Sequence, residues 1–351
     1  MKTAILTPTF SRFSGPDRVV LNEAMEAAAA GKEVTIFTFR TDFNSQQLPK
    51  NVTVEALGMP KNPLLERIYR LFFFADIFKV NRIVKKLQQF DEAISFLYPM
   101  TLPAMLVKKK KPSLKYVYYD VGIAYPKLFD SILEKIYMKL FASFTKRTVK
   151  NADAAISISR FCSEELKKGT GLDSEVKYVK IDNKRFNGDV SAKYKKQIDS
   201  VIKTYELEEP VLLYVGRISP HKGVHLLLDA FKLIKEKIPS ATLVVVGKHT
   251  FAKYSHQLQK TAAEIGGVVF TGFIPDEDLP AFYGNCDAYV TCSMWEGFNI
   301  PIVEANACGK PAVAFRVGSH PEVLKKGILV EEGNVKEFAA AVVKLVSPKT
   351  L

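Results

Sequence analysis

The chain has 351 residues, of which 47% are hydrophobic and 25% charged, the composition of a globular protein long enough for two domains. The opening residues do not resemble a signal peptide, since their apolar run stops at Pro8, and no apolar stretch approaches the roughly 20 residues that span a bilayer. The net charge of +13 indicates an anionic partner, and because no nucleic-acid-binding motif accompanies it, phosphate-bearing ligands or anionic membranes are favoured over nucleic acid. The four cysteines lack CxxC spacing, so we expect reduced structural thiols and no zinc site.

Strand-like and helix-like segments alternate through the first half of the chain. The strand-like segments are short and apolar, and the helical segments carry apolar residues at helical spacing. Expected strands cover residues 3–7, 33–39, 52–57, 92–98, 115–119 and 153–158, and expected helices cover 17–30, 64–90, 127–150 and 160–168. This alternation predicts βαβ units, in which helices cover both faces of a parallel sheet.

A polar, lysine-rich interval at 182–210 interrupts this rhythm. The alternation then restarts, with expected strands at 210–216, 242–247, 267–270, 287–291, 311–315 and 327–330. We therefore predict an α/β protein with two doubly wound parallel-sheet domains facing across a cleft, namely an N-terminal domain of residues 1–185, a linker region of residues 186–209 and a C-terminal domain of residues 210–351. In open parallel sheets, ligands bind beyond the carboxyl ends of the strands, so the loops after the strands are the candidate sites.

The loop GRISPHKG, residues 216–223, follows the first strand of the second half and precedes a helix expected near Gly223. Arg217 and Lys222 flank its turn. A guanidinium fork, an ammonium charge and the free N–H groups of a helix start together suit a diphosphate. The loop is neither a Walker loop nor a GxGxxG fingerprint, and an ordinary solvated basic loop is the alternative interpretation.

Two glutamates lie eight residues apart in SMWEGFNIPIVEANACGKPAVAF, residues 293–315. Pro301 predicts a helix over 301–308, so that Glu296 lies in the preceding loop and Glu304 near the helix start. A diphosphate would repel these carboxylates, but sugar hydroxyls would donate hydrogen bonds to them. Together with the cationic loop, the pattern predicts a ligand that carries both phosphates and diols, such as a nucleotide-sugar. Alternatively, Glu304 complements the helix dipole and Glu296 is solvated.

The stretches GRISPHKGVHLLLDAF, TGFIPDEDLPAFYGNCDAYVTCSMWEGFNIPIVEANACGKPAVAF and GSHPEVL together resemble the retaining glycosyltransferases of family 4, which have the GT-B fold of two Rossmann-like domains. The resemblance covers essentially all of 210–335, and it extends more loosely to the first half through a glycine-containing first loop, ISISRFCSEEL and the strand rhythm. It implies transfer of a hexose-like sugar from a nucleotide-diphosphate-sugar to an acceptor hydroxyl, with retention at the anomeric carbon. The nucleotide-sugar is then a substrate, and neither a metal ion nor a cofactor is expected.

The resemblance also implies roles for individual residues. Arg217 and Lys222 look like the pair that binds the donor diphosphate. Glu304 looks like the glutamate that holds the nucleotide ribose, and Glu296 like the glutamate close to the transferred sugar. The remaining implied donor-binding residues are Gly297, Phe298, Asn299 and Ile300 near the sugar and phosphate, Phe273 and Ile274 at the nucleobase, and Gly15 in the first loop.

The chain departs from the family pattern in its first half. The family commonly places a histidine after a first-domain strand near the reacting sugar, but all five histidines of this chain lie in the second half. By register, the strand at 115–119 brings Tyr119 or Asp120 to that position, where either could bind a sugar hydroxyl and Asp120 could also accept a proton. The usual double glycine of the first loop is Ser14-Gly15 here.

The triplet Asp276-Glu277-Asp278 is formally a DxD motif, which binds divalent metal ions in a different glycosyltransferase fold. Here it follows Pro275 and opens a helix, where acidic residues complement the helix dipole. We therefore predict no metal site at this position.

Two helical patterns, at 64–87 and 127–150, combine apolar positions with clustered Lys and Arg. Amphipathic helices packed on a sheet commonly look like this. The aromatic surplus at 69–74 and the lysine run at 108–111 also fit a surface that lies on anionic lipid. We expect a cytoplasmic protein that binds membranes peripherally and acts on a lipid-linked or membrane-proximal acceptor, with soluble glycans or proteins as the other acceptors.

Two further classes of function stay open at this level. One is a GT-B enzyme of different chemistry, such as a nucleotide-sugar epimerase or a glycogen-type synthase. The other is a catalytically silent, nucleotide-binding scaffold at the membrane, for which the missing histidine is the support. Nothing in the residues assigns the base or the sugar of the donor.

Overall fold

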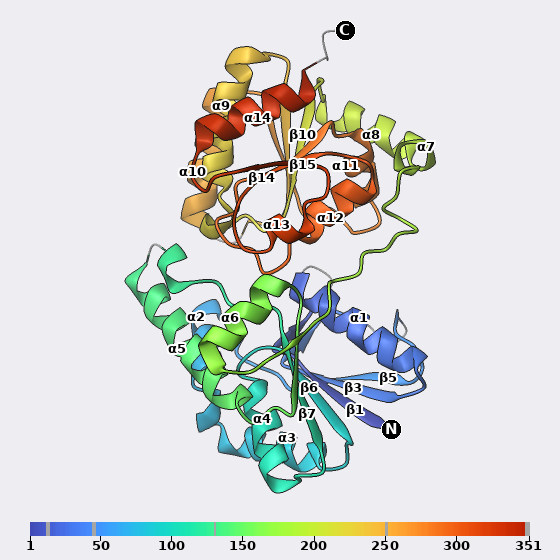
Figure 1. Ribbon diagram of the computed structural model, residues 1–351, viewed down its shortest axis with the longest axis vertical. Coiled ribbons are helices and arrows are strands. Elements are labelled where there is room, and N and C mark those ends of the chain that lie inside the picture. The colour runs from blue at the N-terminus through green and yellow to red at the C-terminus, as the bar shows by residue number, and fades with distance from the viewer. Residues whose placement is uncertain (12–14, 44–46, 130, 250–251, 348–351) are drawn as a thin grey trace. The chain divides into compact units, whose positions relative to one another are not determined.

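The computed structural model describes residues 1–11, 15–43, 47–129, 131–249 and 252–347. The chain divides into two compact units, Met1–Lys180 (unit 1) and Ile181–Leu351 (unit 2). Each unit has its own parallel sheet with helices packed on it, drawn from blue to green for unit 1 and from green to red for unit 2 (Figure 1). The predicted α/β class with two parallel-sheet domains is confirmed.

The sheet of unit 1 has seven strands in the order β5-β3-β1-β6-β7-β8-β9. The strands are β1 (Lys2–Leu6), β3 (Glu33–Thr38), β5 (Val52–Ala56), β6 (Glu92–Ser95), β7 (Lys115–Asp120), β8 (Ala154–Ser157) and β9 (Glu175–Val176). All pair in parallel, and the central strands β1, β6 and β7 are buried over almost their full length. A separate two-stranded ribbon, β2 (Thr9–Phe10) with β4 (Arg40–Thr41), was not predicted.

The helices of unit 1 are α1 (Gly15–Ala29), α2 (Pro63–Leu71), α3 (Ile77–Leu87), α4 (Thr101–Lys110), α5 (Ile132–Val149) and α6 (Arg160–Thr170), with short 3₁₀ turns η2 (Phe73–Ala75) and η3 (Pro126–Leu128). The predicted single helix over 64–90 is wrong. The Asp76 carboxylate accepts a hydrogen bond from the backbone N–H of Lys79 at 3.1 Å, and this cap starts a second helix. Helix α4, whose sequence lacks a clear helical period, was not predicted.

The sheet of unit 2 has six parallel strands in the order β12-β11-β10-β13-β14-β15. The strands are β10 (Val211–Val215), β11 (Thr242–Val246), β12 (Val268–Gly272), β13 (Ala288–Thr291), β14 (Ala312–Phe315) and β15 (Gly327–Val330). Around them lie η4 (Pro220–Lys222), α9 (Val224–Lys237), α10 (Ala252–Ile265), α11 (Leu279–Asn285), α12 (Ile300–Ala307), α13 (His320–Val323) and α14 (Val335–Val346). Each predicted strand of this half appears within one or two residues of its expected place.

Residues 186–209, expected to form a linker region, contain helices α7 (Val190–Lys193) and α8 (Lys195–Tyr205). Both helices pack against α11, and the Ser191 hydroxyl donates to the Gly284 carbonyl at 3.0 Å. Phe186 is buried in the core of unit 2 on the same side of its sheet. Much of this interval is therefore an integral part of unit 2.

Both sheets reverse their strand order beside their first strand. In unit 2, β11 and β12 extend the sheet on one side of β10, and the chain then returns to place β13 on the other side. In unit 1, β6 lies next to β1 in the same way. Loops that leave adjacent strands in opposite directions at such a point open a crevice at the carboxyl edge. The loops after β10 and β13 are the two that carry the predicted diphosphate and glutamate motifs.

We expect Gly223→Ala to destabilise unit 2 more than Gly309→Ala does. Both glycines have a left-handed backbone, with φ of +64° and +75°, so each alanine costs about 1 kcal/mol or more of stability. At Gly223 the added Cβ would also overlap the Cys292 carbonyl oxygen, whereas at Gly309 it would meet no atom within 4 Å. Urea unfolding of the two variants measures the difference. Equal losses would contradict a tight approach of this loop to the end of β13.

Candidate active site

The loops after β10 and β13 touch each other at the carboxyl edge of the unit 2 sheet. Gly223 packs against the Cys292 carbonyl, and the backbone N–H of Met294 donates to the His221 carbonyl at 3.0 Å. The Tyr214 hydroxyl donates to the Arg217 carbonyl at 3.2 Å and so ties the loop after β10 to its own strand. The predicted cationic loop and the predicted glutamate loop therefore form one continuous wall.

Lys222 and Glu296 form an ion pair across this wall. The Lys222 ammonium lies 2.7 Å from Oε2 of Glu296, and the Glu296 side chain is buried. Burial alone would raise the pKa of Glu296, but the charge of Lys222, with side-chain hydrogen bonds from Lys222 and Ser293, outweighs it, so this pKa lies below the usual carboxyl value. Glu296 is accordingly a carboxylate at neutral pH, and the alternative interpretation of a solvated Glu296 is wrong.

Asn299 links Glu296 to the start of α12. Its Oδ1 accepts from the backbone N–H of Ile302 at 3.3 Å, which caps the helix, while its Nδ2 lies 3.3 Å from Oε1 of Glu296. The same Nδ2 lies 2.9 Å from Nε2 of His320, a fully buried side chain at the start of α13. His320 belongs to the stretch GSHPEVL, from which no role was predicted for it. Its position in the loop after the expected strand at 311–315 was a usable signal.

Glu304 lies inside α12, one turn beyond Asn299, and is 2% exposed. Its Oε2 accepts a hydrogen bond from the Tyr283 hydroxyl of α11 at 2.7 Å. A helix-dipole role alone would leave Glu304 solvated, whereas here a buried phenol orients it. Tyr283 was not singled out from the sequence.

The remaining predicted donor-side residues line the same edge. Arg217 is exposed on the loop after β10. Phe273, 43% exposed, and Ile274 follow β12, whose last residue, Gly272, accepts from the backbone N–H of Gly247 at 2.9 Å. Gly297, Phe298 and Ile300 surround Asn299 at the start of α12. Burial lowers the pKa of the nearby His221 to about 3, helped by Lys222 and Arg217, so this ring is neutral and adds no third cation.

In unit 1 the structure places Tyr119 and Asp120 on opposite faces of the end of β7. The Tyr119 ring stacks on Phe96 with ring centroids 4.8 Å apart. The Asp120 carboxylate accepts from the Tyr118 hydroxyl at 3.2 Å and from the Gly122 N–H at 3.1 Å. Burial raises the pKa of Asp120 to about 6, although those hydrogen bonds lower it in part.

The predicted glycine loop of unit 1 is described only in part. Gly15 is the first residue of α1, whereas Ser14 lies outside the described residues. Beside it, Asp17 is buried and accepts from the backbone N–H of Ser11 at 2.9 Å. Burial raises the pKa of Asp17 to about 6 as well.

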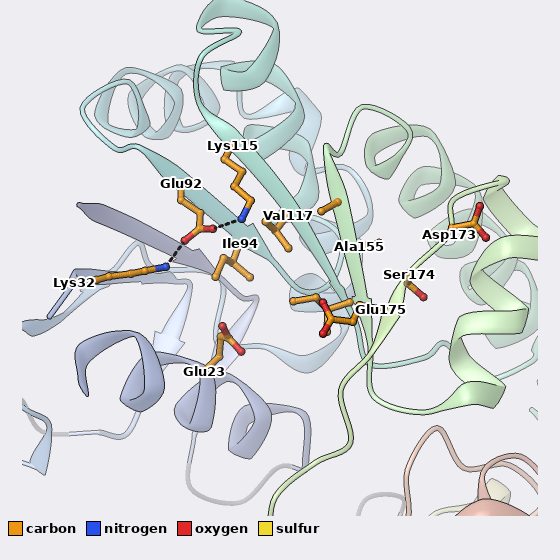
Figure 2. Close-up of a pocket in the computed structure, with 12 residues that line it drawn as sticks. Glu23, Lys32, Glu92, Ile94, Lys115, Val117, Ala155, Asp173, Ser174 and Glu175 are labelled. Carbon is orange, nitrogen blue, oxygen red and sulfur yellow. Dashed lines mark hydrogen bonds and ion pairs between the residues drawn. The ribbon is translucent and has the colours of Figure 1, made fainter. Parts of the chain in front are cut away.

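A cavity of about 470 Å³ lies elsewhere in unit 1, at the amino-terminal end of β6 and β7 (Figure 2). Its two lysines both pair with one carboxylate, since Lys32 and Lys115 lie 2.9 and 3.1 Å from Glu92. The cavity is therefore at the opposite end of the strands from Tyr119 and Asp120, and both of its cations already contact the Glu92 carboxylate. We assign it no part in the site.

The described part of the chain contains no group of three or more His, Cys, Asp or Glu side chains arranged to hold a metal ion. Asp278 directly precedes α11, and Asp276 and Glu277 precede it in a turn after β12. Among the described residues, no helix is long and apolar enough to cross a membrane.

We expect Asp120→Asn to change how stability depends on pH. With a folded pKa near 6 and an unfolded pKa near 4, Asp120 binds a proton only in the folded state between about pH 4 and pH 6, so its contribution to stability falls as the pH rises through this window. Asparagine, which resembles the protonated form, should remove that loss. From about pH 4 to pH 7 the variant should gain up to about 3 kcal/mol relative to the parent.

Urea unfolding of parent and variant at both pH values gives this relative change. The contribution of Asp17 is common to both proteins and cancels in the comparison. A stability difference that is the same at both pH values would contradict a raised pKa at Asp120.

Comparisons with known proteins agree with this architecture. Residues 13–180 match the family model "Glycosyltransferase Family 4", and residues 195–350 match "Glycosyl transferases group 1". HepE of Anabaena in complex with UDP and glucose superimposes with a TM-score of 0.79 at 20% identity, over 99% of this chain and 90% of that one. WaaG, a glycosyltransferase of lipopolysaccharide biosynthesis, gives a TM-score of 0.76 at 17% identity over the same shares of the two chains. At these identities the likeness shows the fold, which is GT-B.

Curated relatives align over a shorter range. A GDP-mannose-dependent alpha-(1-6)-phosphatidylinositol monomannoside mannosyltransferase of Mycolicibacterium smegmatis is 30% identical over 213 residues, 56% of this chain and 54% of the relative. O-antigen chain mannosyltransferase B of Escherichia coli is 34% identical over 137 residues, 38% of this chain and 36% of the relative. The alignments thus span about half or less of the relatives' own length.

One family model matches each of the two parallel-sheet units. The chain belongs to glycosyltransferase family 4, with its second half in the glycosyl transferases group 1.

Proposed function

We propose that this protein transfers a hexose from a nucleotide-diphosphate-sugar to an acceptor hydroxyl with retention of anomeric configuration. The observation that carries the proposal is the ion pair of Lys222 with Glu296 at the strand-order reversal of unit 2. It joins a cationic loop, which also carries the exposed Arg217, to a carboxylate at a helix start. Cations and amide N–H groups suit the two phosphates, and carboxylates suit the sugar diols.

The relatives support a donor of this class. The mycobacterial relative is named for its dependence on GDP-mannose, and HepE has been solved with UDP and with UDP-glucose. Since these donors differ in base and sugar, both GDP- and UDP-sugars are candidates for this chain. Retention is proposed because the chain belongs to a family of retaining enzymes.

Arg217 and Lys222 are proposed to neutralise the leaving diphosphate, together with the backbone N–H groups at the start of α12. Preorganised positive charge of this kind stabilises the negative charge that develops as the glycosidic bond breaks. Neither a divalent metal ion nor another cofactor is then required. The Asp276–Asp278 segment keeps the helix-start role proposed from the sequence.

The other site residues take complementary roles in this proposal. Glu304 binds the ribose hydroxyls from the position fixed by Tyr283, and Glu296 lies against the transferred sugar. Gly297, Phe298, Asn299 and Ile300 bring backbone close to the sugar and phosphate, and Phe273 and Ile274 contact the base. In unit 1, Gly15 belongs to the phosphate-facing loop, and Asp120 or Tyr119 acts on the acceptor side. Asp120 is a better proton acceptor than Tyr119, since its pKa of about 6 is close to neutral pH.

We expect Arg217→Ala and Lys222→Ala each to weaken binding of GDP or UDP, because each removes a charge-assisted contact worth about 1.5–3 kcal/mol. Isothermal titration calorimetry with the two diphosphates gives the affinities, and Lys260→Ala, an exposed lysine within helix α10 of unit 2, is the matched control. Unchanged affinity in both variants would refute the diphosphate assignment.

Transfer from the nucleotide-sugar that binds, run with and without excess chelator, tests the reaction itself. Equal rates are expected, and a rate that magnesium or manganese restores would contradict metal independence. An epimerised donor would instead identify a nucleotide-sugar epimerase, and growth of a soluble glucan would identify a glycogen-type synthase. Donor binding with neither hydrolysis nor transfer would identify a catalytically silent scaffold.

The acceptor is proposed to be lipid-linked or membrane-proximal, because unit 1 exposes an apolar surface on α2, η2, α3 and α5. Eleven of the sixteen large hydrophobic side chains exposed in the described residues lie there. We call this the α2–α5 surface, and it consists of Leu64, Leu65, Ile68, Phe72, Phe74, Ile77, Phe78, Ile132, Leu133, Ile136 and Leu140. The helical pattern at 64–87 also predicts Leu87 on the same face as Leu64 and Phe78, but Leu87 is buried.

Helices α2 and α5, which carry seven of these side chains, lie side by side in unit 1 (Figure 1). The rings of Phe74 and Phe144 approach to 5.6 Å, and the Arg67 guanidinium lies 3.1 Å from the Glu134 carboxylate. Residues 61–87 and 127–150 contain thirteen Lys and Arg against four Asp and Glu, so they carry +9 of the net charge of +13. This charge disfavours pairing with a second copy and favours an anionic bilayer, at which each basic residue contributes about 1 kcal/mol.

We expect the protein to sediment with vesicles of phosphatidylcholine and phosphatidylglycerol at low salt, but not with phosphatidylcholine alone. Phe78→Ser with Leu133→Ser should reduce this binding about tenfold or more, since both side chains are largely exposed, at 91% and 78%, and would insert among the lipids. Ile202→Ser, an exposed apolar residue of unit 2, is the control. No binding by the folded parent, or dimerisation through this surface in gel filtration, would contradict membrane docking.

A further inference from the structure

His320 is a fully buried polar side chain that the proposed chemistry does not use. A buried imidazole needs a partner at each ring nitrogen, because an unpaired one loses its hydrogen bond to water. His320 has both partners, with Nδ1 2.6 Å from the Phe315 carbonyl oxygen and Nε2 2.9 Å from Nδ2 of Asn299.

These partners determine where the ring proton lies. A carbonyl oxygen only accepts, so Nδ1 of His320 must donate to Phe315 and carry the hydrogen. Burial lowers the pKa of His320, and although Glu296 and the Phe315 carbonyl act the other way, the ring is neutral. Nε2 therefore has a free lone pair, and it accepts a hydrogen bond from Asn299.

The Asn299 amide is then fixed in both orientation and position. Its Oδ1 accepts from the Ile302 N–H at 3.3 Å, so its Nδ2 has two hydrogens to donate. One goes to Nε2 of His320 at 2.9 Å, and the other is directed to Oε1 of Glu296 at 3.3 Å. An amide rotated by 180° would place its oxygen against two acceptors.

Glu296 is consequently held from both sides. Lys222 holds Oε2, and Asn299, itself oriented by His320, holds Oε1. The Glu296 carbonyl also accepts from the backbone N–H of Ser319, the residue before His320, at 3.0 Å. A Cβ at the preceding Gly318 would overlap that carbonyl, so the α13 start and the glutamate loop pack tightly together.

We propose that His320 is a positioning residue that acts through Asn299 to hold the Glu296 carboxylate in the orientation required for sugar transfer. The proposal rests on the proposed function for the role of Glu296, but the hydrogen-bond chain itself does not depend on it. A merely structural role would require only that His320 fill its buried space, and a neutral apolar side chain of similar size would then serve equally well.

His320→Phe keeps the bulk and removes both ring nitrogens, so it separates these two roles. We expect kcat to fall about 10-fold to 100-fold, as for small misplacements of a reacting group, while the donor KM changes little. Thr101→Val is the matched control, since it also removes a buried hydrogen bond, of 2.7 Å to Thr148, but does so in unit 1. Rates are normalised to the folded fraction.

A double-mutant cycle with Asn299→Ala tests the route of the effect. If His320 acts through Asn299, the double variant should be no slower than Asn299→Ala alone. Effects that multiply in the double variant, or a His320→Phe kcat equal to that of Thr101→Val, would overturn the proposal.

Two readouts need no transfer activity. Nitrogen-15 NMR of the histidine rings should show His320 as the neutral Nδ1–H tautomer at about pH 7.5, because its pKa is lowered. A crystal structure of His320→Phe should show an intact fold in which Asn299 no longer donates to Glu296. A charged or Nε2–H ring, or an Asn299 amide that still donates to Glu296 in the variant, would refute the positioning role. A parent that binds neither GDP nor UDP would instead refute the proposed function and leave these two results to decide the chain of hydrogen bonds.

Discussion

The site of unit 2 depends on one constraint, the reversal of strand order that places β13 beside β10. Without this reversal, Lys222 and Glu296, which are 74 residues apart in the sequence, would not be brought into contact. The reversal brings the two loops to the same stretch of sheet edge. The loops can then touch because Gly223 has no Cβ, which would overlap the Cys292 carbonyl oxygen. Every further contact in the site, from the α12 cap to the α13 start, is built on this approach.

The interior of the site is polar, yet its buried charged side chains have an ion-pair or hydrogen-bond partner close by. Glu296 is balanced by Lys222, Glu304 is oriented by the Tyr283 hydroxyl, and His320 is neutral. Only paired or hydrogen-bonded groups of this kind are tolerated at such depth, because a lone buried charge would cost several kcal/mol. The site is therefore assembled before any ligand arrives, which reduces the entropy lost on binding.

Much of this architecture could be predicted from the sequence. The twelve principal strands could be located because each is a short apolar run bounded by polar or glycine residues, and parallel strands buried on both faces have that pattern. The two loops of the candidate site could be located because each motif follows directly on the end of an expected strand. Features set by one local bond were missed, such as the break before α3, where the Asp76 cap overrides a continuous apolar period. The edge strand β9, two residues long, depends on pairing with β8 rather than on its own composition.

Contacts between side chains were the least predictable part of the site. The partners of His320 and Glu304 come from other elements, and spacing in sequence does not show which atoms will face each other. The exposed face of α2 and α5 is a similar case. The pattern at 64–87 marked apolar positions correctly, but whether they pack inward, like Leu87, or outward, like Phe78, depends on how the two helices flank the sheet.

The ion pair of Lys222 with Glu296 also bears on how the proposed reaction would end. A bound diphosphate and the Glu296 carboxylate compete for one ammonium group, so part of the attraction for the nucleotide is offset by weakening an existing contact. After the proposed transfer, the Glu296 carboxylate would form its ion pair with Lys222 again as the nucleoside diphosphate leaves. In the proposed reaction the pair would thus limit product inhibition and favour turnover over tight retention of the nucleoside diphosphate.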